Sequence, residues 1–235
     1  MPLSAREIDR LGERIKGGDV TDQDRHLLEE FRVSYLPAYQ EVVGRIREVM
    51  GLHPSGRPDK RLESIVAKLQ REETSLSQMQ DIAGCRIVVE DWEQQNWVVQ
   101  GLVQVFERTR VVDRRQKPRH GYRAVHVIVR TQGRPVEVQV RTFLQDLWAN
   151  VVEGLSSEAG DLKHGVELPD YAGTLALMAD AADAIAFAEG ERGLDSLTAA
   201  ETAKLTLREG ALYRTGLFRG IVWSAMHFHL RRIQR

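Results

Sequence analysis

The chain has one cysteine, few aromatic residues and almost no net charge. Because Cys85 is the only cysteine in the 235 residues, no intramolecular disulfide can form, and no Cys/His spacing indicates a zinc site. The thiol lies in the apolar run of residues 85–89, which favours a buried structural cysteine over a reactive one. The formal net charge of −1 argues against a protein that binds polyanions over its whole surface.

Long apolar runs are also missing. No stretch approaches the ~18 apolar residues of a membrane span, and residues 1–7 lack the apolar core of a signal peptide. We therefore expect a cytoplasmic protein without a membrane partner. The length allows one large domain with helical additions, and 42% hydrophobic and 29% charged residues are typical of globular proteins.

The clearest pattern that is present lies between residues 111 and 148 and predicts a β-hairpin. Valines alternate with other residues on both sides of a turn signal at residues 131–135, at Val125, Val127, Val129, Val136, Val138 and Val140. Period-2 alternation places them on one face, which we expect to pack in the core. The other face would carry Tyr122, Ala124, His126, Glu137, Gln139 and Arg141. That face could be a binding surface or an ordinary solvent-facing sheet surface.

Basic residues are concentrated around the same hairpin. Residues 110–141 contain nine Lys or Arg and only two acidic residues, Asp113 and Glu137. A cationic segment within a nearly neutral chain indicates a defined anionic ligand, such as a nucleotide or the end of a nucleic acid.

Two stretches ahead of the hairpin have polar residues that suit a phosphate ligand. On a helix, residues 59–71 would place apolar residues on one face and Lys60, Ser64, Lys68 and Arg71 on the opposite one. This stripe would suit a polyphosphate, and it would equally suit a solvated basic face. Asp81 precedes an apolar strand, where it could bind Mg²⁺ or form a turn before Gly84.

Helical patterns flank this region on both sides. Residues 5–16 predict a short helix, and Thr21 predicts the N-cap of a helical run to about Met50 that is interrupted near Pro37. The apolar stripe of that run comprises Leu27, Leu28, Phe31, Tyr35, Val42, Val43, Ile46 and Val49. A helix at 91–106, a strand at 109–113 and a helix at 143–155 with a core Trp148 follow. We expect an N-terminal helical segment at 1–50, a core at 51–160 and a C-terminal helical extension at 161–235.

Five short motifs, taken in order, resemble the RelA/SpoT synthetase domain. They are Lys60-Arg61-x-x-Ser64-Ile65-x-x-Lys68-Leu69-x-Arg71, Asp81-Ile82-Ala83-Gly84-Cys85-Arg86, Gly121-Tyr122-Arg123-Ala124-Val125-His126, Glu137-Val138-Gln139-Val140-Arg141-Thr142 and Trp148-Ala149. Each motif alone is weak, and five in one order are specific. The resemblance implies an α+β fold with a nucleotidyltransferase-like mixed β-sheet flanked by helices.

The resemblance also implies a reaction, the transfer of the β,γ-pyrophosphate of ATP to the 3′-hydroxyl of GDP or GTP, and roles for individual residues. Lys60, Arg61, Ser64, Lys68, Arg71 and Arg86 would hold the ATP phosphates. Asp81 would bind Mg²⁺, and Glu137 would share the metal or activate the attacking hydroxyl. Tyr122 would stack on the acceptor base, and the further acceptor contacts would be His126, Gln139, Lys117, Arg119 and Arg123.

Three departures from the alarmone synthetase pattern leave the acceptor open. Pro58 stands where many members have Arg, Asp113-Arg114-Arg115 replaces Asp-Tyr-Ile, and no Glu-His pair follows Trp148. These features resemble divergent small members, some of which are toxins that pyrophosphorylate the 3′ end of tRNA and some of which act in phage defence.

Two alternatives to a guanine nucleotide acceptor therefore stay open. The first is the same transfer onto tRNA, with Arg114, Arg115, Lys117 and Arg119 on backbone phosphates and an antitoxin protein as partner. The second is a catalytically silent nucleotide-binding regulator, although the presence of both Asp81 and Glu137 favours an enzyme. The helical extensions could support a homo-oligomer.

Overall fold

The computed structural model describes residues 3–18, 20–115, 118, 121–146, 148–150 and 153, so the predicted C-terminal extension lies outside the described residues. The chain forms two compact units. The first comprises Met1–Ile87, Trp97–Val112 and His126–Val140, and the second comprises Val88–Asn96, Asp113–Val125 and the described residues from Arg141 onward. Among the helices of the described residues, none combines the length and the apolarity that crossing a bilayer requires.

Three helices form the N-terminal part, α1 (Ala5–Gly17), α2 (Asp22–Val33) and α3 (Leu36–Met50). Ser4 and Thr21 cap α1 and α2, each with a reciprocal capping box, which confirms the predicted N-cap at Thr21. The predicted interruption is also confirmed, because α2 ends before Ser34 and Pro37 lies in the first turn of α3, where a missing N–H costs nothing.

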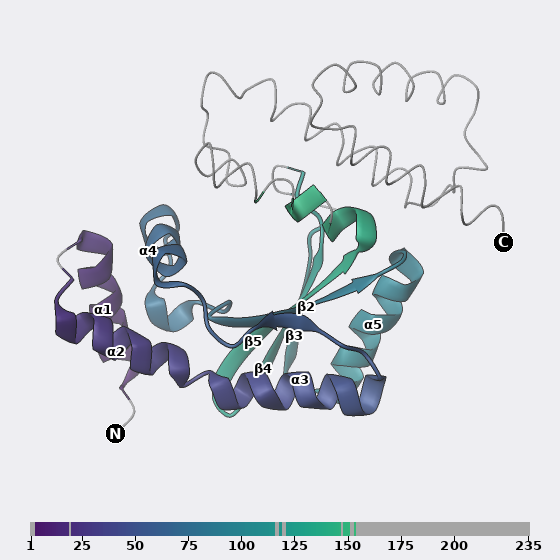
Figure 1. Cartoon of the computed structure of the whole chain (residues 1–235), viewed down its shortest axis with the longest axis horizontal. Helices are drawn as coiled ribbons and strands as arrows, with labels where there is room; N and C mark the ends of the chain where they lie inside the picture. The colour runs from purple at the N-terminus through teal and green to yellow at the C-terminus, as the bar shows by residue number, and fades with distance from the viewer. Residues whose placement is uncertain are drawn as a thin grey trace, which may run out of the picture. The chain divides into compact units, whose positions relative to one another are not determined.

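A five-stranded sheet follows, in the order β1-β2-β5-β4-β3. Its strands are β1 (Ser55–Arg57), β2 (Ala83–Val89), β3 (Thr109–Asp113), β4 (Val125–Thr131) and β5 (Arg134–Thr142). Between them lie α4 (Leu62–Arg71), the short 3₁₀ helix η1 (Leu76–Gln78) and α5 (Trp92–Val105). Figure 1 shows α3 lying along one face of the strands. The predicted fold class, a mixed sheet with flanking helices and a helical N-terminal region, is confirmed.

The hairpin of β4 and β5 buries the predicted valines. All six have at most 1% of their surface exposed. The turn is shorter than the sequence predicted, because only Gln132 and Gly133 lie outside the strands. Both have a positive φ, 49° and 75°, as two-residue hairpin turns of the right twist require. The start of the first strand was also wrong, because β4 begins at Val125 and not at Tyr122.

Two helix predictions need correction. The helix expected from residue 59 begins at Leu62, with Arg61 at its N-cap, so Lys60 precedes the helix and does not belong to its polar stripe. The stripe predicted for α3 is buried as far as Ile46, but Val49 is 62% exposed. Val49 lies in the last turn of α3, beside an open groove that it lines together with Met50 and Trp97.

The turn of the hairpin is bound to α2 and α3 by polar contacts. The guanidinium of Arg134 lies 5.3 Å from the ring centroid of Phe31 and 5.0 Å from that of Tyr35. Glu41 of α3 accepts hydrogen bonds from Thr131 Oγ1 and Gln132 Nε2, both at 2.8 Å. These contacts join segments about ninety residues apart in the sequence, and they fix the end of the hairpin against the N-terminal helices.

We predict that Arg134→Ala lowers the free energy of unfolding by about 1–2 kcal/mol, because it removes two cation–π contacts at once. Urea unfolding followed by circular dichroism measures this change. The matched control is Arg130→Ala on the same hairpin, where the side chain is exposed, and its effect should stay within about 0.5 kcal/mol. Equal losses for the two variants would show that the contacts with Phe31 and Tyr35 do not stabilise the fold.

Candidate active site

Six polar side chains of the first unit gather around the beginning of β2. They are Lys60 from the loop before α4, Lys68 from α4, Asp81 just before β2, His126 from β4, and Glu137 and Gln139 from β5. All six come from motifs that the sequence singled out. The folded chain brings together the segments 60–68, 81, 126 and 137–139.

Asp81 is held by two lysines. Lys60 Nζ lies 2.5 Å from Oδ2, and Lys68 Nζ lies 3.0 Å from Oδ1, so each carboxylate oxygen has its own cation. Burial by itself would raise the pKa of Asp81, but the two ammonium groups outweigh it and lower the pKa to about 2. Asp81 is therefore a carboxylate at neutral pH.

The position of Lys60 depends on Arg32, a residue that the sequence did not identify. Arg32 Nε donates a 2.7 Å hydrogen bond to the backbone carbonyl of Lys60, and its Nη2 forms an ion pair with Asp59. The sequence pattern around α2 predicts an apolar stripe, and Arg32 does not belong to it. Because 28 residues separate Arg32 from Lys60, no local sequence pattern indicates the contact.

Glu137 is held by two donors. Its Oε1 lies 2.8 Å from His126 Nδ1, and its Oε2 accepts a 2.7 Å hydrogen bond from Gln139 Nε2. Burial raises the pKa of Glu137 and the charge of Asp81 raises it further, but hydrogen bonding and charge from His126 outweigh both and lower the pKa overall. Asp81 thus lies within electrostatic range of Glu137, whose backbone packs against Gly84, three residues after Asp81.

Gly84 allows β2 to approach β5 closely at Glu137. A Cβ atom on Gly84 would lie 3.1 Å from the carbonyl oxygen of Glu137 and 3.7 Å from its Cβ. The residue lies within β2, so the glycine serves strand packing there and does not form a turn after Asp81.

Cys85 is the buried structural thiol that the sequence predicted. Only 3% of the residue is exposed, and burial, together with the charge of Glu137, raises the pKa of the thiol to about 12. A thiol of this pKa is not a nucleophile at neutral pH.

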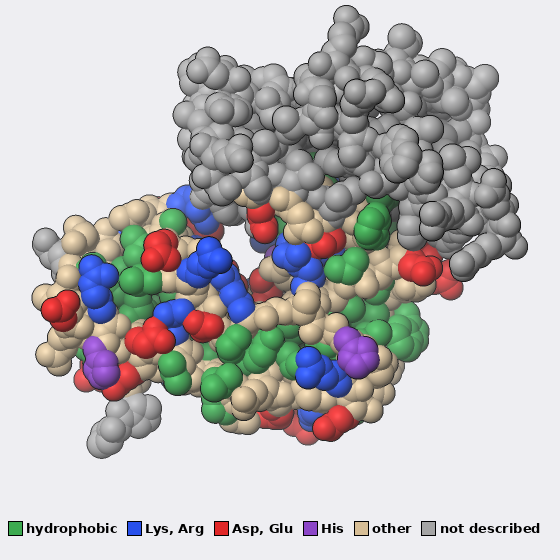
Figure 2. Space-filling model, viewed as in Figure 1, with side chains coloured by type: hydrophobic (Ala, Val, Ile, Leu, Met, Phe, Trp, Pro, Cys, Tyr) green, Lys and Arg blue, Asp and Glu red, His purple; other side chains and the backbone are tan. Residues whose placement is uncertain are grey.

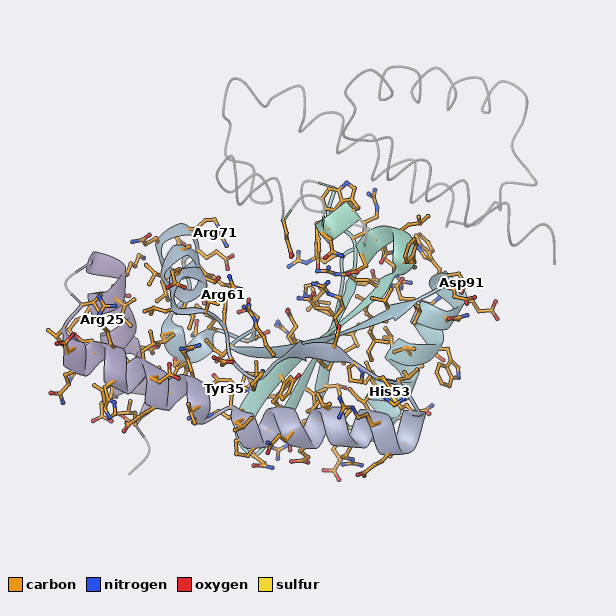
Figure 3. The ribbon with its side chains drawn as sticks, in the orientation of Figure 1. Arg25, Tyr35, His53, Arg61, Arg71 and Asp91 are labelled. Carbon is orange, nitrogen blue, oxygen red and sulfur yellow. The ribbon has the colours of Figure 1, made fainter. Side chains whose placement is uncertain are left out.

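The other predicted phosphate-binding residues lie on or next to α4 and β2. Arg61 and Arg71 are exposed at the two ends of α4 (Figure 3), and Ser64 is half-buried between them. Arg71 forms an ion pair with Glu72 at 3.4 Å. Arg86 is half-buried on β2. On the face drawn in Figure 2, basic side chains gather over α4 with acidic side chains beside them.

The second unit contains Tyr122, the residue predicted to stack on the acceptor base. Its hydroxyl accepts a 3.1 Å hydrogen bond from Arg141, whose guanidinium also lies 5.2 Å from the Tyr122 ring centroid. Arg141 is 1% exposed and pairs with Asp146 at 3.0 Å. Trp148 is buried, as predicted, 6.5 Å from the Tyr122 ring. Tyr122 is thus held by buried neighbours, and its stacking role stays a prediction.

The basic loop that precedes Tyr122 is only partly described. Lys117 and Arg119 lie outside the described residues. Arg115 forms an ion pair with Asp113 at 2.6 Å, donates to Asn96 at 2.8 Å and lies 5.4 Å from the ring centroid of Trp92. Arg123 is buried and donates to the carbonyl of Gly121 at 3.3 Å. Arg115 therefore makes its polar contacts within the protein.

The described carboxylates could form a metal site with two protein ligands, in which other molecules supply the remaining ligands. Across the part of the chain that the structure describes, no group of three or more His, Cys, Asp or Glu is arranged to hold a metal ion. Asp81 and Glu137 supply two carboxylates within electrostatic range of each other. Two carboxylates match the usual Mg²⁺ site, in which water and substrate phosphates supply the remaining oxygens.

Comparison with known proteins confirms the predicted family resemblance. Residues 56–158 match the family model described as "Region found in RelA / SpoT proteins", and this region includes every residue of the gathered site. This part of the chain is similar to the RelA/SpoT family. The uncharacterized proteins Mb1401 of Mycobacterium bovis and Rv1366 of Mycobacterium tuberculosis are 38% identical over 102 residues, which is 42% of this chain. The aligned part spans 37% of the length of those relatives.

Solved structures share the fold. Small alarmone synthetase 2 from Bacillus subtilis is 26% identical, with a TM-score of 0.50 over 71% of this chain and 93% of its own. Small alarmone synthetase 1 from the same organism is 22% identical, with a TM-score of 0.54 over 79% of this chain and 98% of its own. It has also been solved with its product pppGpp, at 22% identity and a TM-score of 0.53, with the same coverage.

We predict a specific dependence of stability on pH from the ion pairs of Asp81. Its pKa falls from the ordinary 3.8 to about 2 on folding, so its carboxylate stabilises the protein above pH 3.8, and that contribution disappears as the pH falls through about 2. The shift corresponds to about 2 kcal/mol. The difference in free energy of unfolding between wild type and Asp81→Asn should therefore shrink by about this amount from pH 5 to pH 2.

Urea titrations at several pH values measure this difference, and carboxyl groups that do not interact with Asp81 cancel because both proteins contain them. A difference that stays constant over the whole range would show that the lysines do not lower the pKa of Asp81.

Proposed function

We propose that the protein is an ATP-dependent pyrophosphokinase that transfers the β,γ-pyrophosphate of ATP to the 3′-hydroxyl of GDP or GTP and so makes (p)ppGpp-type alarmones. The observation that carries this proposal is the arrangement of Asp81 between Lys60 and Lys68, with Glu137 close by. Phosphoryl transfer depends on positioning and on neutralising phosphate charge, for which cations and carboxylate-bound Mg²⁺ are suited. The pppGpp bound to a protein of the same fold supports this acceptor class.

The basic residues would bind ATP, the pyrophosphate donor. Lys60, Arg61, Ser64, Lys68, Arg71 and Arg86 would bind the ATP phosphates, and the two lysines already lie together at Asp81. Asp81 and Glu137 would hold Mg²⁺, which neutralises charge on the phosphate oxygens when bound. ATP phosphates would then replace Asp81 as the partners of the lysines.

The acceptor end of the reaction is assigned to Glu137, and the family resemblance assigns Tyr122 and three basic residues to it as well. The carboxylate of Glu137 would accept the proton of the 3′-hydroxyl group. At the same time, the oxygen of that hydroxyl group would form a bond to the β-phosphorus of ATP. The bond between the β-phosphorus and the α,β-bridging oxygen breaks, and AMP leaves with that oxygen. Tyr122 would stack on the base, and Lys117, Arg119 and Arg123 would contact the acceptor phosphates.

The transfer to tRNA uses the same donor chemistry, and only the acceptor differs. It requires free cations before Tyr122, and the contacts of Arg115 with Asp113 and Asn96 occupy one of the arginines assigned to that role. The guanine nucleotide is therefore our first choice of acceptor. Antitoxin binding and self-association through the helical extensions are further proposals that rest on the family resemblance alone.

We predict that GDP or GTP becomes labelled when the protein is incubated with γ-³²P-ATP and Mg²⁺, because the γ-phosphate moves with the transferred group. GDP, GTP and deacylated tRNA are offered separately, and products are resolved by thin-layer chromatography or on a gel. Label on tRNA alone would replace the proposed acceptor by tRNA. Label on none of the three would favour a silent regulator.

We further predict that Glu137→Gln lowers the transfer rate by at least about 100-fold while leaving the fold intact, since an amide cannot accept the hydroxyl proton. The matched control is Glu93→Gln, the same change at an exposed position in the first turn of α5, which should retain the wild-type rate. Circular dichroism establishes that both variants are folded. Transfer by Glu137→Gln near the wild-type rate would remove Glu137 from the mechanism.

A further inference from the structure

The two hydrogen bonds of Glu137 use the side chains that were expected to bind the acceptor. Those side chains are His126 on β4 and Gln139 on β5, and each contacts a different oxygen of the carboxylate, at 2.8 and 2.7 Å. The His126 and Glu137 side chains are 16% and 13% exposed, so water competes little for these bonds. A carboxylate has about four lone pairs, and two donors leave further lone pairs for a substrate hydroxyl or a metal.

We infer that His126 and Gln139 are positioning residues that hold the carboxylate of Glu137, and that acceptor binding is not their main role. The inference rests on the proposed function, because it takes Glu137 as the group that receives the hydroxyl proton. It assigns His126 and Gln139 an effect on the rate of transfer and not on the affinity for the acceptor.

The contact also fixes which nitrogen of His126 carries a proton. An ionised carboxylate only accepts hydrogen bonds, so Nδ1 of His126 must be the donor at 2.8 Å. The bond therefore requires a proton on Nδ1, whether or not Nε2 also carries one, and one ring orientation. Gln139 has a fixed orientation for the same reason, because its Nε2 must face Oε2.

The backbone of Glu137 is already fixed from the other side, so only its side-chain torsions remain to be set. Gly84 of β2 packs directly against the Glu137 backbone, and Val136 and Val138 on either side are fully buried. Two hydrogen bonds to opposite oxygens then fix the plane of the carboxylate. Misplacement of a catalytic group by about 1 Å can cost about 100-fold in rate, which is the effect that such positioning prevents.

The chain offers a matched comparison in a second histidine–glutamate pair. His26 Nε2 lies 3.3 Å from Glu30 Oε1 on α2, and both side chains are more than half exposed, at 75% and 59%. This pair contains the same residue types at a solvent-exposed position. His26→Asn is therefore the control for the same substitution at residue 126.

We predict that His126→Ala lowers kcat by about 10- to 100-fold while the KM for the acceptor stays within about 2-fold. His126→Asn should recover most of the rate, because its amide nitrogen can occupy the place of Nδ1 and donate to Glu137. His126→Gln places its amide at the position of Nε2 and should not recover it. His26→Asn should leave both constants unchanged.

A rise in acceptor KM at unchanged kcat would overturn the inference, because that result identifies His126 as an acceptor contact. Equal rates for His126→Ala and His126→Asn would overturn it as well.

A second measurement does not depend on activity. Nitrogen chemical shifts of the histidine rings, recorded by NMR on the folded protein, should show that Nδ1 of His126 carries a proton. A ring protonated only on Nε2 would contradict the inference, because Nδ1 would then have no hydrogen to donate. If the wild type transferred pyrophosphate to no acceptor, the proposed function would fail, and this measurement would still test whether His126 holds Glu137.

Discussion

The site depends on the neutralisation of two neighbouring carboxylates within a partly buried setting. Charges removed from water are costly unless opposite charges or donors surround them. Asp81 meets this requirement through Lys60 and Lys68, and Glu137 meets it through His126 and Gln139. Each carboxylate is accompanied by groups from other segments of the chain, so the acidic pair can exist only when α4, β2, β4 and β5 are assembled.

Contacts over long sequence separations hold this assembly in place. Arg32 fixes the loop that carries Lys60, and Arg134 and Glu41 fix the turn of the hairpin that carries His126 and Glu137. The N-terminal helices therefore do more than cover a sheet face. They determine where the loop before α4 and the turn between β4 and β5 lie, and through these elements they determine where the charged groups lie.

Local patterns in the sequence predicted much of this structure. They failed where contacts between residues far apart in the sequence determine the local conformation. Alternation identified the buried valines and placed His126 on the same strand face as Glu137, and Thr21 identified a helix start. The start of α4 was wrong because Arg32 and Asp81 hold Lys60 outside the helix, and these partners lie 28 and 21 residues away. The hydrogen bond between His126 and Glu137 could not be predicted from the sequence, because it depends on how β4 and β5 are aligned. The length of the turn sets that alignment, and the turn-forming residues 131–135 did not show that the turn contains only Gln132 and Gly133.

The buried thiol of Cys85 can be used to detect local opening of the protein, without a label being introduced. It is the only sulfhydryl group in the sequence, and it lies on β2 directly after Gly84, beside the strand that carries Glu137. With a pKa near 12 and 3% exposure, it reacts with alkylating reagents mainly in molecules in which the structure around β2 has opened. The rate of alkylation in the native protein therefore reports how readily the structure around this strand opens.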